Sequence, residues 1–160
     1  MTSFVIRPGD LIFVGGSDLL GRIIEEVTDS PYCHVAGLVK ENELIEAQGF
    51  RKTGYQGLDY YAGRADVYTC DSLTNEQIKE IVEYVTDFVG TRYDYLLLAW
   101  EWARYKLHRV WPYKETKTRI CSTLWADAYR EAGVDLCPGI IYPTPGDLAK
   151  SSLLRKVCSF

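Results

Sequence analysis

Cys121 is the residue in this chain with the clearest potential for chemistry. It opens a segment in which Leu124 and Ala128 recur at helical spacing, and Gly133 follows at the position of a C-terminal cap. We therefore predict a helix over 121–132 with the cysteine at its first residue. The unpaired N–H groups and the positive end of the helix dipole stabilise a thiolate there, and the thiolate is the nucleophilic form of cysteine. A single cysteine in an apolar segment is more often a small buried side chain. Whether Cys121 is a nucleophile therefore depends on the partners that the rest of the chain can supply.

A cysteine nucleophile needs a base, and the chain contains only two histidines. His108 lies among Arg104, Lys106 and Arg109, whose positive charge would lower its basicity. His34 stands at the start of an apolar, strand-like segment. We predict His34 as the base, and the alternative is a histidine that is merely hydrogen-bonded at a strand edge.

Glu46 is the candidate for the third group, which would orient the imidazole of His34. It lies in the next strand-like segment, where the two-residue period places Leu44 and Gln48 on the same face. A carboxylate between apolar neighbours is either solvated, which is the commoner case, or paired with a cation such as an imidazolium. We predict the paired arrangement, with Gln48 as the alternative orienting residue, and expect Glu43 to point to the other face.

The elements that must position these side chains alternate between strands and helices. Strands are predicted at 9–14, 34–39, 43–48, 65–70 and 154–159, and the second and third should form an antiparallel hairpin. Helices are predicted at 17–27, 74–90, 94–108 and 121–132, with a helical turn from residue 147. The helix after residue 74 is the best supported, because Thr74 and Gln77 form a capping box and Gly90 closes it. Residues 49–62 and 137–146 are expected to be loops.

The composition is that of an ordinary globular domain. With 160 residues, 47% of them apolar and 25% charged, we expect a single domain over 1–160. A net charge of -4 and the lack of a long Lys/Arg stripe argue against a nucleic-acid partner. No apolar run reaches about 18 residues and no leader pattern is present, so we expect no transmembrane segment and a cytoplasmic protein.

The five cysteines indicate reduced thiols. Their number is odd and no Cys-x-x-Cys pair occurs among Cys33, Cys70, Cys121, Cys137 and Cys158. This usage suits a reducing compartment better than a disulfide framework or a zinc site. We expect no metal and no cofactor. Cys33, next to the predicted base, could be inert or could bond to Cys121 on oxidation.

Seven short motifs occur in an order that resembles a known superfamily. The order is similar to that of circularly permuted NlpC-type, papain-like cysteine hydrolases of the YiiX/YebB-like kind, in which the cysteine helix follows the histidine strands. The motifs are Gly9-Asp10-Leu11-Ile12, the helix 17–27, Tyr32-Cys33-His34-Val35, Ile45-Glu46-Ala47, Gly90-Thr91-Arg92-Tyr93-Asp94, Ile120-Cys121-Ser122 and Tyr142-Pro143-Thr144-Pro145-Gly146-Asp147-Leu148.

The resemblance implies an α+β papain-like fold, an antiparallel sheet packed by helices with the nucleophile at a helix N-terminus. By position, Cys121 resembles the nucleophile, His34 the base and Glu46 its orienting group. Tyr93 resembles the family tyrosine that stabilises the oxyanion together with the Cys121 N–H. Packing in the core is the alternative for Tyr93.

The function implied is that of a cysteine peptidase or amidase. It would cleave a small peptide or amide, similar to cell-wall peptides, through a thioester on Cys121. One alternative is thiol-dependent lipid acyl transfer of the lecithin retinol acyltransferase type, for which aromatic residues between Trp100 and Tyr113 could line an acyl pocket. Another is a binding module without turnover. The substrate's identity and the oligomeric state remain open.

Overall fold

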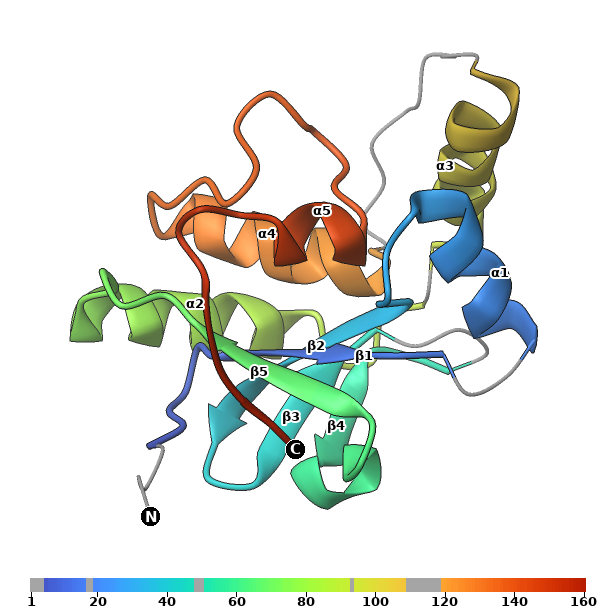
Figure 1. Ribbon diagram of the computed structural model, residues 1–160. Coiled ribbons are helices and arrows are strands. Elements are labelled where there is room, and N and C mark those ends of the chain that lie inside the picture. The colour runs from blue at the N-terminus through green and yellow to red at the C-terminus, as the bar shows by residue number, and fades with distance from the viewer. Residues whose placement is uncertain (1–4, 17–18, 48–50, 93, 109–118) are drawn as a thin grey trace.

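The structure is a computed structural model that describes residues 5–16, 19–47, 51–92, 94–108 and 119–160. Within these residues, six strands form one antiparallel sheet in the order β4-β3-β2-β1-β5-β6 (Figure 1). The strands are β1 (Leu11–Val14), β2 (His34–Lys40), β3 (Glu43–Glu46), β4 (Gly54–Gly57), β5 (Ala65–Thr69) and β6 (Arg155–Ser159). The helices are α1 (Leu19–Thr28), η1 (Leu58–Tyr61, a 3-10 turn), α2 (Asn75–Asp87), α3 (Tyr95–Leu107), α4 (Cys121–Glu131) and α5 (Pro145–Ala149).

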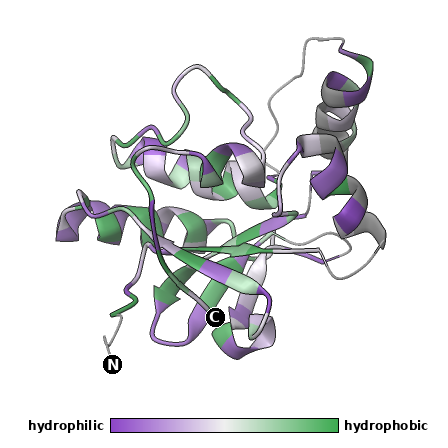
Figure 2. Ribbon diagram, viewed as in Figure 1, coloured by the Kyte–Doolittle hydropathy of each residue, from purple (hydrophilic) through white to green (hydrophobic). Residues whose placement is uncertain are grey.

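Both faces of the sheet are covered, and β1 shows this directly. All four of its residues are buried. Leu11 and Phe13 belong to the apolar cluster that includes α4, whereas Ile12 and Val14 belong to a second cluster with η1. A strand covered on both faces is apolar throughout rather than alternating. The central strands are accordingly mostly hydrophobic (Figure 2).

Helix α4 packs closely on the sheet. The Trp125 ring lies over Gly37 of β2, where an added Cβ would come within 2.4 Å of the ring. The Trp125 Nε1–H donates to the carbonyl of Ile45 at 3.1 Å, and the Tyr129 hydroxyl donates to the carbonyl of Gly9 at 2.6 Å. These buried hydrogen bonds fix the helix to β3 and to the segment just before β1. Its N-terminal residue is therefore held at one end of β2.

Most predicted elements are confirmed, including the hairpin of β2 with β3 and the capping box of Thr74 with Gln77. The α+β fold with a cysteine at a helix N-terminus is confirmed as well. Helix α5 begins at Pro145, two residues before the predicted turn, because Thr144 caps it and accepts from the Asp147 N–H. Residues 17–18, predicted as the start of the first helix, lie outside the described residues.

The prediction of one loop over 49–62 is wrong for its second half. Strand β4 pairs with β3 in the register Leu44 with Gln56, and the 3-10 turn η1 follows directly. Its glycines and partly exposed residues carry little apolar periodicity, so the segment had no local strand signal. Pairing with the edge of β3 supplies the stabilisation that the local sequence lacks.

Candidate active site

Cys121 is the first residue of α4 and is almost fully buried, at 5% exposure. Ile120 precedes it in extended conformation, and its side chain offers no cap to the first turn. The N–H groups of Ser122 and Val35 instead hydrogen-bond to the Cys121 sulfur. Burial opposes ionisation, but the charge of His34 and these hydrogen bonds outweigh it and lower the pKa of the Cys121 thiol.

His34 starts β2 and lies between Cys121 and Glu46. Its Nε2 is 2.8 Å from Glu46 Oε2, and its side chain also hydrogen-bonds to Cys121, which leaves Nδ1 for the sulfur. The ring is 14% exposed. Burial disfavours the imidazolium, yet the charges and hydrogen bonds of Cys121 and Glu46 raise the pKa of His34. The neighbouring groups therefore favour a thiolate–imidazolium pair.

Glu46 ends β3 and reaches His34 diagonally across the hairpin. The register pairs Gly37 with Ile45, so its continuation sets Glu46 opposite Ala36, two residues along from His34 and on the same face. The residue is 5% exposed. Burial raises the pKa of Glu46, but its hydrogen bond to His34 and the charge of that ring bring the pKa below its ordinary value. The carboxylate is paired, as a buried charge must be.

Tyr61 is a partner of this site that the sequence did not reveal. Its hydroxyl donates a short hydrogen bond to Glu46 Oε2, and its ring centroid lies 5.8 Å from that of His34. Tyr61 is 2% exposed, and the guanidinium of Arg64 lies 5.1 Å from its ring centroid. Burial and the adjacent Glu46 raise the pKa of Tyr61 far above its usual range, so it donates as a neutral hydroxyl.

The residues just before Cys121 are anchored by charge. Arg119 Nε donates to Asp127 Oδ2 at 2.7 Å, and the same guanidinium lies 5.2 Å from the ring centroid of Phe88 on the segment after α2. The carbonyl of Arg119 accepts from the N–H of the buried Asp94 at 3.2 Å. These contacts hold the entry to α4 against both α2 and the segment before α3.

The other residues considered from the sequence lie elsewhere. Glu43 pairs with Lys40 at 3.0 Å, and His108 is exposed. Cys33 contacts the carbonyl of Val14 at 3.6 Å, and none of the five cysteines, all of them described residues, forms a disulfide. Tyr93 and Gln48 lie outside the described residues, so their predicted roles stay predictions.

Part of the predicted aromatic wall is visible beside α3. The rings of Trp100 and Tyr142 are 5.4 Å apart and nearly perpendicular. Arg104 lies over Trp100 at 5.2 Å and donates from Nη2 to the Tyr142 carbonyl at 3.3 Å. This links α3 to the loop before α5. The predicted continuation through Tyr113 falls in 109–118, outside the described residues.

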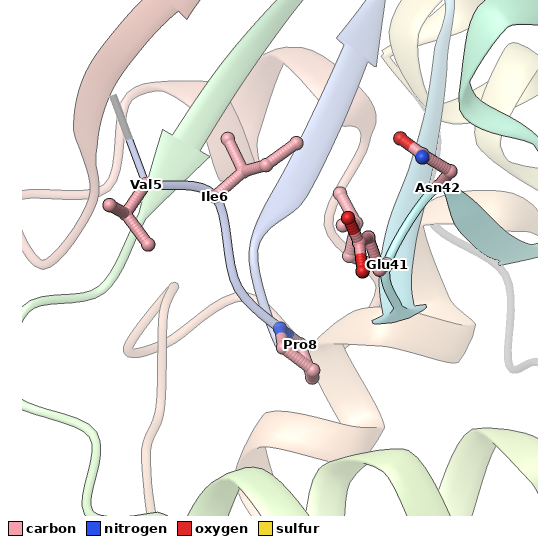
Figure 3. Close-up of a pocket in the computed structure, with 6 residues that line it drawn as sticks. Val5, Ile6, Pro8, Glu41 and Asn42 are labelled. Carbon is pink, nitrogen blue, oxygen red and sulfur yellow. The ribbon is translucent and has the colours of Figure 1, made fainter. Parts of the chain in front are cut away.

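A pocket of about 340 Å³ lies at the other end of β2 from His34 (Figure 3). It is lined by Val5, Ile6, Pro8, Leu38, Glu41 and Asn42. Glu41 and Asn42 form the turn between β2 and β3, whereas His34 starts β2. The pocket is therefore separate from the Cys121 group.

No protein-family model and no curated protein matches the chain. Among solved structures, one described as the metalloprotein yiiX from Escherichia coli O157:H7 (DUF1105) matches with a TM-score of 0.72. The match covers 96% of this chain and 97% of that one, at 17% identity. The chain has the yiiX fold. This fold is papain-like, which confirms the predicted fold class. As in the predicted permuted order, the cysteine helix α4 follows the histidine strand β2 in sequence.

Two negative findings concern the described residues of this yiiX-like chain. None of their helices is both long and apolar enough to cross a membrane. Nor do their His, Cys, Asp and Glu side chains gather in threes or more around a point where a metal ion could bind.

Proposed function

We propose that the protein is a cysteine hydrolase that cleaves an amide bond in a small peptide or related molecule. The observation that carries this proposal is the hydrogen-bonded series Cys121, His34, Glu46 at the N-terminus of α4. A thiol, an imidazole and a carboxylate in this order form the apparatus of nucleophilic acyl transfer. The match to the yiiX fold supports the proposal, because that fold is papain-like.

In the first half of the reaction, the Cys121 thiolate attacks the carbonyl carbon and a C–S bond forms. The carbonyl electron pair moves to oxygen, and the N–H of Cys121 is positioned at the helix start to donate to it. When the intermediate collapses, the C–N bond breaks and the His34 imidazolium gives its proton to the leaving nitrogen. The products are a thioester on Cys121 and a free amine. Tyr93 remains the predicted second donor to the oxyanion.

In the second half, water replaces the amine. His34, now neutral, takes a proton from water as its oxygen attacks the thioester carbon. The C–S bond then breaks, which releases a carboxylic acid and restores the thiolate–imidazolium pair. Glu46 keeps the ring oriented and stabilises its charged form throughout, and Tyr61 holds Glu46 in place.

The yiiX protein is described as a metalloprotein, but a metal ion does not fit the residues of the Cys121 group. The His34 ring lies between Glu46 and Cys121, and its Nε2 is already bonded to the carboxylate. The three donors therefore form a row rather than a shell around one point, as metal coordination requires. No step of the proposed mechanism passes through a metal.

The proposal is tested by trapping the thioester. Incubation with p-nitrophenyl acetate should add one acetyl group to the protein, and peptide mapping by mass spectrometry should locate it on Cys121. Cys121→Ala should abolish the adduct, whereas Cys158→Ala, which removes a partly buried thiol of β6, should retain it. Acetylation of the Cys121→Ala protein at the wild-type rate would contradict the mechanism.

Turnover separates the alternatives. Hydrolysis of aminoacyl p-nitroanilides would support the amidase, and acyl transfer only from phospholipid vesicles would support the lipid reaction. A reactive Cys121 that binds small amides without turnover would support a binding module.

A further inference from the structure

Two segments beside the Cys121 group run antiparallel and carry cations that face each other. The Thr53 N–H donates to the Thr91 carbonyl at 2.9 Å, and the Gly90 N–H donates to the Thr53 carbonyl at 2.8 Å. Between them, Lys52 and Arg92 form an antiparallel bridge. Residues opposite each other in such a pair extend to the same face, and like charges there repel and destabilise the pairing.

The carboxylates of the described residues form no ion pair with these cations. Arg51, Lys52 and Arg92 are all exposed, and none forms an ion pair within that part of the chain. Some other surface cations do form ion pairs, since Lys79 pairs with Glu83 and Lys156 pairs with Asp66. The pairing of two neighbouring segments thus concentrates positive charge on a chain whose net charge is -4.

The same segments adjoin the proposed active site. Two residues after Arg92, the Asp94 N–H donates to the carbonyl of Arg119, just before the start of α4. The chain from α2 to α3 passes beside this end of α4 (Figure 1). Burial raises the pKa of Glu46, His34 and Tyr61 lower it, and the charge of Arg51 adds a smaller lowering. The segments that carry the three cations therefore adjoin the thiol–imidazole–carboxylate row.

We propose that Arg51, Lys52 and Arg92 form a cationic rim that selects substrates with a carboxylate beside the scissile amide. The inference rests on the proposed function and names the charge of its substrate. An anion at the rim would relieve the repulsion between Lys52 and Arg92, and the field of three cations would raise the local concentration of anionic substrates at the site. A neutral substrate would gain neither effect.

Two alkylating reagents of nearly equal size test the rim. Iodoacetate carries a carboxylate and iodoacetamide does not, so the ratio of their second-order rates at Cys121 measures selection for negative charge. Lys52→Glu should pair with Arg92 and remove the excess charge. We expect the iodoacetate-to-iodoacetamide ratio to fall roughly five-fold at low ionic strength, with little change at high salt. The melting temperature should hold or rise, because a repulsive pair becomes an attractive one.

The matched control is Lys79→Glu on α2, which changes the net charge equally. Its ratio should remain near that of the wild type. An equal ratio in the two variants would overturn the rim, and so would a lower melting temperature for Lys52→Glu than for Lys79→Glu. The proposed function fails separately: slow reaction of wild-type Cys121 with neutral iodoacetamide would contradict the hydrolase, while the ratio would still report on the rim.

Discussion

Cys121 at the start of α4 and Cys137 beyond its end are both buried, free thiols, at 5% and 6% exposure. Burial raises the pKa of each. At the helix start, the charge of His34 and two backbone N–H groups reverse the effect and lower the pKa of Cys121. Beyond the helix end, the charge of Asp147 adds to burial, and the pKa of Cys137 rises to about 11. Neighbours, rather than burial, therefore decide which thiol can act as a nucleophile.

The substitution with the largest expected effect removes the imidazole that distinguishes Cys121 from Cys137. His34→Ala takes away the imidazolium, so the pKa of the Cys121 thiol should rise toward that of Cys137. We expect acetylation of Cys121 by p-nitrophenyl acetate at neutral pH to slow by about 100-fold. Stopped-flow release of p-nitrophenol measures this rate.

Glu43→Ala is the control for that substitution. Glu43 lies in the same strand as Glu46 but pairs with Lys40 at the other end of the hairpin, so the rate should stay near that of the wild type. Equal slowing by Glu43→Ala and His34→Ala would show that the loss comes from disturbing the hairpin and not from the imidazole.

The second prediction concerns the other thiol. Because the folded state raises the pKa of Cys137 to about 11, its contribution to stability is full below the unfolded pKa of about 8.5 and is lost as the pH rises through the folded value. The loss should amount to about 3 kcal/mol in the free energy of unfolding. Urea unfolding at pH 8 and pH 11 should show this extra decline in the wild type and not in Cys137→Ala. Parallel declines in the two proteins would refute the raised pKa.

The smallest effect should come from removing the hydrogen bond that Tyr61 donates to Glu46. Tyr61→Phe removes one donor to Glu46 and leaves the ring in place, at a cost of about 1 kcal/mol in the free energy of unfolding. The pKa of Glu46 should rise, and acetylation of Cys121 should slow a few-fold. Tyr60→Phe is the matched control, since Tyr60 is 49% exposed and adjoins Tyr61. Identical rates for the two variants would remove Tyr61 from the site.

Elements with a local signal could be predicted from the sequence. Thr74 and Gln77 marked the start of α2, and the apolar spacing after Cys121 marked α4. The hairpin pattern placed Glu46 in the strand next to that of His34, and the register then set the two residues on one face. That prediction needed no long-range information, because a hairpin is itself local.

What escaped prediction depends on contacts distant in the sequence. Strand β4 forms by pairing with β3, and Tyr61 reaches Glu46 from fifteen residues away. The bridge between Lys52 and Arg92 pairs residues that are forty positions apart in the sequence. No periodicity of residue types encodes such approaches. Tyr93 remains a prediction from resemblance alone.

The most direct test of the thiolate–imidazolium site is the pH profile of iodoacetamide labelling, with each cysteine quantified by mass spectrometry. We predict that Cys121 alone reacts fast well below the ordinary thiol pKa of about 8.5, while Cys137 stays unreactive until far higher pH. A Cys121 that reacts no faster than the other four thiols, with an ordinary pKa, would rule out the thiolate–imidazolium pair.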